Sequence, residues 1–138
     1  MNNSVLVDTN ILIYAIDADS QFHHRALRFL SDPTIRCFIT SKNISEFLVV
    51  LTRNEEINIS TSECLELLND LIVDIDILYP NSMTIKLFYD LIKKYNPRGL
   101  WIHDLEIASI SIAHGISKIV TNNIVDFKRI DEIDIIQI

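Results

Sequence analysis

The fold of this chain is indicated first by its opening stretch, Ser4-Val5-Leu6-Val7-Asp8-Thr9-Asn10-Ile11-Leu12. The apolar run 5–7 is typical of a buried strand, and the apolar pattern of a helix begins at Ile11. A carboxylate, a hydroxyl and an amide stand between the two. In open α/β sheets, ligands bind in the crevice beyond the carboxyl ends of the strands. Asp8 is therefore a candidate functional residue, placed at the rim of a sheet by the first strand.

The rest of the chain alternates in the same way. Strands are expected at 5–7, 36–40, 74–79, 118–121 and 134–138, and helices at 11–16, 22–30, 41–53, 60–72, 81–95 and 103–114. Acids alternate with apolar residues in 74–79, which predicts a strand near a sheet edge. Apolar residues surround most of the helix 103–114, which predicts that it is enclosed. Strands that alternate with helices predict a three-layer α/β/α sandwich with a central, mostly parallel sheet.

Length and composition limit the classes of protein to consider. A chain of 138 residues has an ordinary size for one domain, so we expect residues 1–138 to form a single domain. The longest apolar stretch, 47–51, is far shorter than the roughly 20 residues that span a bilayer, and no secretory signal is recognisable. We therefore expect a cytoplasmic protein with no membrane segment. Cys37 and Cys64 lack the spacing of metal ligands and are expected to be buried thiols.

The net charge bears on the choice of partners. Twelve basic and 19 acidic side chains give a formal charge of −7, which argues against broad, nonspecific binding of nucleic acid. Two bound divalent cations would offset four of these negative charges and can reverse the local sign at their site. An acidic chain can therefore still act on a nucleic acid at a metal centre.

Three further acids occupy positions like that of Asp8. Glu46 lies early in the helix after the second strand, Asp104 begins the enclosed helix, and Asp126 follows the fourth strand. All four can meet at one sheet edge, where two carboxylates about 4 Å apart repel by roughly 4 kcal/mol at an effective dielectric constant near 20. Such a cluster needs protons or cations, and oxygen ligands without Cys or spaced His favour Mg²⁺ or Mn²⁺. The chemistry that fits is phosphodiester hydrolysis by a metal-activated water.

Each acid also has a structural interpretation. Asp8 and Asp104 can cap or complement the starts of helices, Glu46 can lie on a helix surface, and Asp126 can belong to a generally acidic C-terminal segment. Formation of an aspartyl-phosphate at Asp8 would need a second acid nearby, whereas residue 10 is an amide. The joint pattern of the four acids favours a shared site.

Four ordered segments resemble the PIN domain, especially its VapC-like toxin branch. They are Val7-Asp8-Thr9-Asn10, Ser45-Glu46-Phe47, His103-Asp104-Leu105-Glu106-Ile107-Ala108 and Thr121-Asn122-Asn123-Ile124-Val125-Asp126-Phe127. The resemblance implies an Mg²⁺- or Mn²⁺-dependent endoribonuclease that hydrolyses RNA. It further implies the toxin of a type II toxin–antitoxin pair, with a VapB-like antitoxin as partner, and often a homodimer.

The resemblance also implies roles for the four acids. Asp8 and Asp104 match metal ligands, while Glu46 and Asp126 complete the catalytic quartet. Many relatives read Thr-x-Asp after the fourth strand, whereas this chain has an amide at Asn123 and the acid three residues later. An amide oxygen accepts hydrogen bonds but does not neutralise a cation. The fourth ligand is left open between Asp126 and the position of Asn123.

Polar residues next to the acids are candidates for supporting roles. Such residues either orient Asp8, a metal-bound water or the substrate, or they satisfy turn backbone. They are Thr9, Asn10, Thr121 and Asn123. His103 points away from its neighbour Asp104 on a helix and is expected at the substrate rim or in a structural role.

A small group of basic residues precedes Asp104. We expect Lys93, Lys94 and Arg98 to contact RNA phosphates; the alternative is that the lysines complement the end of a helix. Tyr95 and Trp101 can stack on an unpaired base or belong to the core or a dimer interface.

Residues 11–30 carry more apolar side chains than a pair of helices needs, which suggests a homodimer interface or an antitoxin groove. These side chains are Leu12, Tyr14, Ile16, Phe22, Leu27 and Phe29. Two rival functions stay open. One is a housekeeping RNA-processing nuclease of the same fold, and the other is a catalytically silent binding module.

Overall fold

A five-stranded sheet lies at the centre of the computed structural model, which describes residues 3–138. The strand order is β3-β2-β1-β4-β5, and every pair of neighbours is parallel. The strands are β1 (Ser4–Val7), β2 (Arg36–Thr40), β3 (Asp76–Leu78), β4 (Lys118–Val120) and β5 (Asp134–Ile136). The prediction of a central, mostly parallel sheet is confirmed, and the sheet is parallel throughout.

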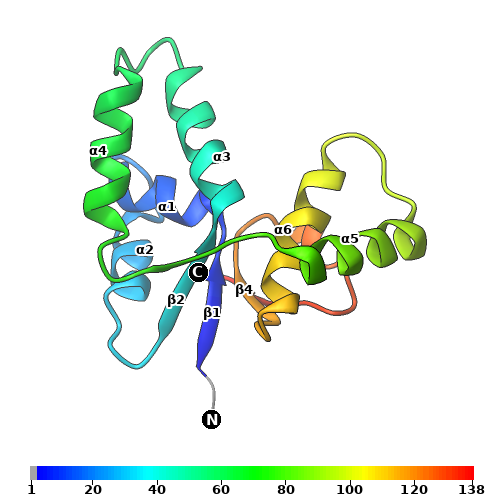
Figure 1. Cartoon of the computed structure of the whole chain (residues 1–138). Coiled ribbons are helices and arrows are strands. Elements are labelled where there is room, and N and C mark those ends of the chain that lie inside the picture. Colours follow the sequence, from blue (N-terminus) through cyan, green and yellow to red (C-terminus); the bar gives the residue numbers. More distant parts are fainter. Residues whose placement is uncertain (1–2) are drawn as a thin grey trace.

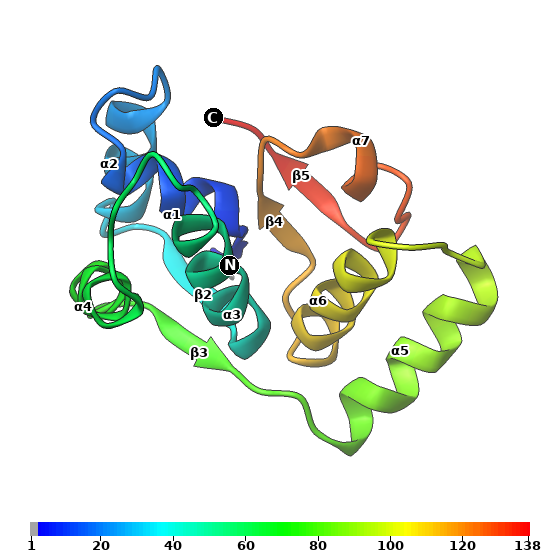
Figure 2. The ribbon, with the colours of Figure 1, turned by 90° about the horizontal axis from the view of Figure 1, so that it is seen from above.

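Helices cover both faces of this sheet (Figures 1 and 2). One face carries α1 (Thr9–Ile16), α2 (His23–Leu30), α3 (Ser41–Thr52) and α4 (Thr61–Leu71). The other carries α5 (Ser82–Tyr95), α6 (Trp101–Ala113) and α7 (Ile124–Phe127). The predicted three-layer α/β/α sandwich is therefore confirmed. Within residues 3–138, no helix is long and apolar enough to cross a membrane.

The sheet separates two hydrophobic cores. Successive side chains of a strand point to opposite faces, so Val5 and Val7 pack with α1 to α4 while Leu6 packs with α5 to α7. In β2, Cys37 and Ile39 belong to the first core and Phe38 to the second. Burial of both faces of β1 and β2, the central strands, explains why these two strands read as continuous apolar runs.

Helix α6 is enclosed, as its sequence predicts. Its buried residues are Leu105, Ile107, Ala108, Ser109, Ile110 and Ser111. The two serines tolerate burial because their hydroxyls donate to the backbone oxygens of Leu105 (2.7 Å) and Ile116 (2.6 Å). This rigid helix fixes the position of Asp104 in its first turn.

Some boundaries differ from the sequence-based expectation. The edge strand expected at 74–79 is shortened to β3 but does lie at the edge of the sheet, and α6 begins two residues earlier than expected, at Trp101. Helix α7 is not predicted from sequence, because four residues are too few to show a helical period. Cys37 and Cys64 are both buried free thiols, as expected.

The apolar surplus expected in 11–30 is mostly absent. Leu12 is fully buried, and Tyr14, Ile16 and Phe29 pack against the first core. Leu27, at 39% exposure, is the large apolar side chain of this segment that remains open to solvent. The structure therefore gives this segment little free apolar area for a partner.

Candidate active site

The carboxyl ends of the neighbouring strands β1 and β4 lie side by side at one end of the sheet. In Figure 1 the strands run upward from the N-terminus, so Figure 2 looks down on this end. The backbone N–H of Asp8 donates to the carbonyl of Val120 (3.0 Å), which extends the β1–β4 pairing by one residue. Asp8 and Thr121, the first residues after the two strands, are thereby held next to each other.

Asp8 is buried, with 6% of its surface exposed, and both of its carboxylate oxygens are engaged. One accepts from the backbone N–H of Thr9 (2.8 Å), so Asp8 caps α1. The other accepts from the hydroxyl of Thr121 (2.7 Å) and the amide of Asn10 (3.3 Å). Burial raises the pKa of Asp8 to about 6, although the bonds from Thr121 and Thr9 act in the opposite direction. Asp8 thus caps a helix and also presents a carboxylate of raised pKa at the rim.

Glu46 is hydrogen-bonded to Thr9, the residue that follows Asp8. The Thr9 hydroxyl donates to Glu46 Oε2 (2.8 Å) and accepts from Asn43 Nδ2 (3.0 Å). Asn43 is fully buried and also forms a capping box with Thr40 at the start of α3. Sequence analysis missed Asn43; the available signal is the Thr40-x-x-Asn43 spacing, an amide variant of the usual capping box.

Asp104 identifies the site as a shared acidic pocket. Burial raises its pKa to about 7, and the negative charges of Asp8, Asp126 and Glu46 add to this rise, in that order of size. The positive charge of Arg129 acts in the opposite direction. Asp8, Glu46 and Asp126 therefore lie within electrostatic range of Asp104, although the four acids come from separate parts of the chain.

The segment after β4 distinguishes the roles of Asn123 and Asp126. The backbone N–H of Asn123 donates to Thr121 Oγ1 (2.9 Å), and its side-chain amide donates to Asp126 Oδ2 (3.2 Å). Asp126 lies in the short helix α7, where Arg129 pairs with its carboxylate at 3.4 Å, and its negative charge acts on Asp104. Asn123 is thus a hydrogen-bond donor to Asp126.

The chemistry of these donors fits a hard divalent cation. The pocket offers carboxylate, amide and hydroxyl oxygens, which Mg²⁺ and Mn²⁺ prefer. As they stand in residues 3–138, no three His, Cys, Asp or Glu side chains lie close enough to hold one ion together. Mg²⁺ is commonly held by one or two carboxylates while it keeps several waters, so this spacing is compatible with such an ion.

The predicted basic group lies at the end of α5. Lys93 and Lys94 occupy the last turn of α5, and Lys94 pairs with Glu132 at 2.9 Å. This arrangement matches the alternative interpretation, in which the lysines complement a helix end. Arg98 is exposed in the following loop. Arg129, which no sequence pattern singled out, is the basic residue that pairs with one of the four acids.

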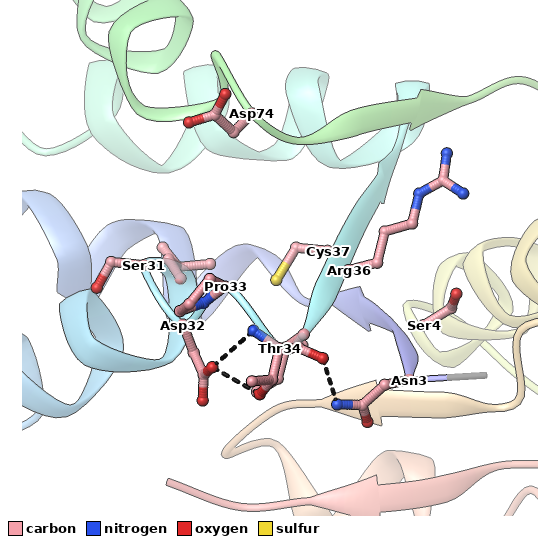
Figure 3. Close-up of a pocket in the computed structure, with 11 residues that line it drawn as sticks. Asn3, Ser4, Ser31, Asp32, Pro33, Thr34, Arg36, Cys37 and Asp74 are labelled. Atoms are coloured by element: carbon pink, nitrogen blue, oxygen red, sulfur yellow. Dashed lines mark hydrogen bonds between the residues drawn. The ribbon is translucent and has the colours of Figure 1, made fainter. Parts of the chain in front are cut away.

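A hollow of about 760 Å³ lies at the opposite end of the strands, beside the starts of β1 and β2 (Figure 3). Its polar groups bond to one another, since Asp32 accepts from both the N–H and the hydroxyl of Thr34, and Asn3 donates to the Thr34 carbonyl. Burial raises the pKa of the Cys37 thiol to about 11, which keeps it protonated and unreactive. This hollow contains none of the four acids, and the acids with raised pKa, Asp8 and Asp104, lie elsewhere.

Fold and site together define a parallel α/β/α domain with electrostatically coupled acids around Asp8, beyond the carboxyl ends of β1 and β4. The chain belongs to the PIN domain family, whose sequence model matches residues 5–133. The resemblance noted from four short segments is thus confirmed over nearly the whole chain.

Several solved structures share this fold. VapBC2 from Rickettsia felis, bound to a DNA fragment from its promoter, matches with a TM-score of 0.73 and 22% identity over 98% of both chains. DNA-bound VapBC from Salmonella typhimurium matches with a TM-score of 0.71 and 23% identity over 99% of this chain and 98% of the other. VapC20 of Mycobacterium tuberculosis, a sarcin-ricin loop cleaving toxin, matches with a TM-score of 0.70 and 11% identity over 91% and 94% of the two chains. No curated protein sequence matches the chain.

Proposed function

We propose that this protein is a divalent-metal-dependent endoribonuclease. The observation that supports the proposal is that, in a PIN domain, the charges of Asp8, Asp126 and Glu46 all act on Asp104. Carboxylates that raise one another's pKa form an unfavourable cluster, and a cation offsets that repulsion. An Mg²⁺ or Mn²⁺ ion supplies a water of lowered pKa and neutralises charge on a phosphate.

The chain's own residues have distinct parts in this proposal. Asp8 and Asp104 would hold the ion. Thr121 and Asn10 hold the Asp8 carboxylate in one orientation, because both donate to its Oδ2. Glu46, fixed by the Thr9 hydroxyl, and Asp126, fixed by Asn123, complete the negative pocket. These donors keep the carboxylates ready to accept an ion or a water proton without rearrangement.

The test is cleavage of a mixed pool of single-stranded RNA with Mg²⁺, with Mn²⁺ or with EDTA. Activity should require the metal and should fall about 100-fold or more in Asp8→Asn and Asp104→Asn, since several kcal/mol of transition-state stabilisation depend on the ion. Asp90→Asn, which removes an exposed acid of α5, is the matched control and should retain full activity. Cleavage in EDTA, or a fully active Asp8→Asn, would contradict the mechanism. An inactive but RNA-binding wild type would favour the silent binding module.

We further propose that the protein is the toxin of a VapBC-like pair that acts in the cytoplasm. The support is the likeness of the whole chain to VapBC structures from Rickettsia felis and Salmonella typhimurium, together with the pocket. Co-expression with the product of the adjacent gene should give a stable complex with suppressed RNA cleavage. If induction of the RNase arrests growth and co-expression of that product relieves the arrest, the protein is a toxin. One that causes no arrest is a housekeeping nuclease.

A homodimer also remains a proposal. Light scattering coupled to gel filtration, at several protein concentrations, measures the mass directly. A mass of twice the chain is expected, and a monomer at every concentration would contradict it.

A further inference from the structure

Arg129 lies beside the acidic pocket and is held there from two sides. Its Nη2 donates to Asp126 Oδ1 at 3.4 Å, and its guanidinium carbon lies 3.8 Å above the centre of the Trp101 ring. Its positive charge also opposes the rise in the pKa of Asp104, so it lies within electrostatic range of that acid. A stacked guanidinium is restricted to one plane, so fewer conformations are lost when it binds a ligand.

The ring under Arg129 is itself fixed. Trp101 Nε1 donates to the backbone carbonyl of Asp126 (3.1 Å), which ties the start of α6 to α7. The Tyr95 ring packs edge-on against Trp101, with centroids 5.9 Å apart, and the Tyr95 hydroxyl donates to Glu132. The guanidinium is therefore held on a rigid platform whose position is coupled to Asp126, one of the four acids.

Most of the donors of Arg129 remain free. A guanidinium carries five N–H donors, and among residues 3–138 only one of them has a partner, at the long distance of 3.4 Å. The side chain is 48% exposed. An exposed single ion pair contributes little to stability, so pairing with Asp126 alone does not account for so constrained an arrangement. The planar fork of an arginine matches the oxygens of a phosphate.

The backbone on both sides of the Arg129 contacts is open to solvent. Leu100, directly before Trp101, is 81% exposed, and Val125, directly before Asp126, is 68% exposed. The nearby Lys94 is already engaged, because it pairs with Glu132 at 2.9 Å and lies over the Tyr95 ring. Arg129 is therefore the basic residue that combines free donors with a contact to one of the four acids.

We propose that Arg129 is a substrate-binding residue, whose guanidinium, stacked on Trp101, donates to an RNA backbone phosphate adjacent to the phosphate at the acidic pocket. The proposal rests on the proposed function, because the strand must enter at that pocket. It assigns the principal basic contact to Arg129 in place of Lys93, Lys94 and Arg98.

Arg36 offers a closely matched control. Like Arg129, it pairs with an aspartate (Asp76, 2.9 Å) and lies over an aromatic ring (Phe38, 4.9 Å). It lies at the start of β2, however, at the opposite edge of the sheet from the four acids. Arg129→Gln and Arg36→Gln therefore remove the same charge and the same kind of contacts, and they differ in distance from the pocket.

Two measurements separate substrate binding from other roles. In steady-state RNA cleavage, Arg129→Gln should raise KM roughly tenfold, the loss expected for one hydrogen bond to a charged group, while kcat stays within about twofold. In RNA binding by an Asp8→Asn background, the same change should reduce the slope of log K against log salt by about 0.7, the value for one phosphate contact to a single strand. Arg36→Gln should change neither quantity. Arg129→Lys should keep the salt slope and recover part of the KM.

Trp101 supplies a second, label-free readout. It is the one tryptophan of the chain, so emission excited selectively at tryptophan, beyond the absorption of the four tyrosines, reports on this platform. Addition of RNA to the Asp8→Asn protein should change that emission, and the change should need higher RNA concentrations in Arg129→Gln.

Different outcomes of these experiments support or overturn substrate binding by Arg129. Equal effects of the two glutamine variants, or an unchanged KM and salt slope in Arg129→Gln, would overturn the proposal. A fall in kcat with constant KM would also overturn it, because Arg129 would then act by positioning Asp126. If the wild type binds RNA without cleaving it and Arg129→Gln weakens that binding, the inference stands and the nuclease function fails. A protein that neither binds nor cleaves RNA refutes both.

Discussion

The hydroxyl of Thr121 is the polar atom on which the pocket most depends. It is fully buried, it donates to Asp8 Oδ2 (2.7 Å), and it accepts from Asn10 Nδ2 (3.2 Å) and from the backbone N–H of Asn123 (2.9 Å). One side chain therefore joins the acid after β1 to the loop after β4. Its bond to Asp8 also opposes the rise in the pKa of that acid.

Thr121→Val should test this dependence, because valine keeps the shape and removes the hydroxyl. We expect kcat/KM for RNA to fall by about 10- to 100-fold, the usual cost of losing a residue that orients a metal ligand. Without the bond from Thr121, the pKa of Asp8 should rise further, so the acidic limb of the pH–rate profile should move to higher pH. Thr52→Val, which removes an exposed hydroxyl at the end of α3, is the control. An unshifted pH profile with full activity would show that Thr121 serves the turn alone.

At the scale of elements, one buried amide connects α3 to the rest of the site. Asn43 accepts from the backbone N–H of Thr40 (2.9 Å) in the capping box and donates to Thr9 at the start of α1 (3.0 Å). The start of α3, the end of β2 and the start of α1 are thus joined by the same side chain. Glu46 lies one turn further along α3, and its carboxylate accepts a hydrogen bond from the same Thr9 hydroxyl.

Asn43→Ala should therefore affect both stability and activity. We expect the free energy of unfolding to fall by about 2–3 kcal/mol, because the buried Thr40 N–H loses its acceptor and the Thr9 hydroxyl loses its donor, while the Thr40 cap itself remains. Activity should also fall, because Thr9 then loses its second anchor. Asn81→Ala removes the N-cap of α5, the helix on the other face of the sheet, and should cost only about 1 kcal/mol with activity unchanged. Denaturant unfolding and RNA cleavage measure the two effects, and equal behaviour of the two variants would refute the special role of Asn43.

At the scale of the whole molecule, the fold brings together charges that repel. Asp8 and Asp104 have pKa values raised to about 6 and about 7. The pKa of such a carboxyl is higher in the folded state than in the unfolded state. Its contribution to stability is fully present below the unfolded-state pKa, and it is lost as the pH rises through the folded-state pKa. The metal-free protein should therefore lose stability between about pH 4 and pH 7, by roughly 3 kcal/mol for Asp8 alone.

Asp104→Asn should remove part of this loss. At pH 8 without metal, the variant should unfold at a higher temperature than the wild type, whereas at pH 4 the two should be similar. Added Mg²⁺ or Mn²⁺ should raise the Tm of the wild type at pH 8 more than that of the variant, because an ion that binds only the folded state stabilises it by mass action. Thermal unfolding with and without EDTA measures both effects. A less stable metal-free variant at pH 8 would contradict the repulsion inferred for this pocket.

The kind and order of the main elements could be predicted from the sequence, because short buried runs and helical spacing are local patterns. The four acids could be proposed as a group from the sequence, because each stands just beyond or early in an element. The neutral side chains that bind those acids emerged from the fold, since Thr121 and Asp8 are 113 residues apart and Asn43 and Thr9 are 34 apart. The same holds for the pairing of Asp126 with Arg129 and for the position of Arg129 on the Trp101 ring. Such contacts depend on how distant elements pack, and no local spacing encodes them.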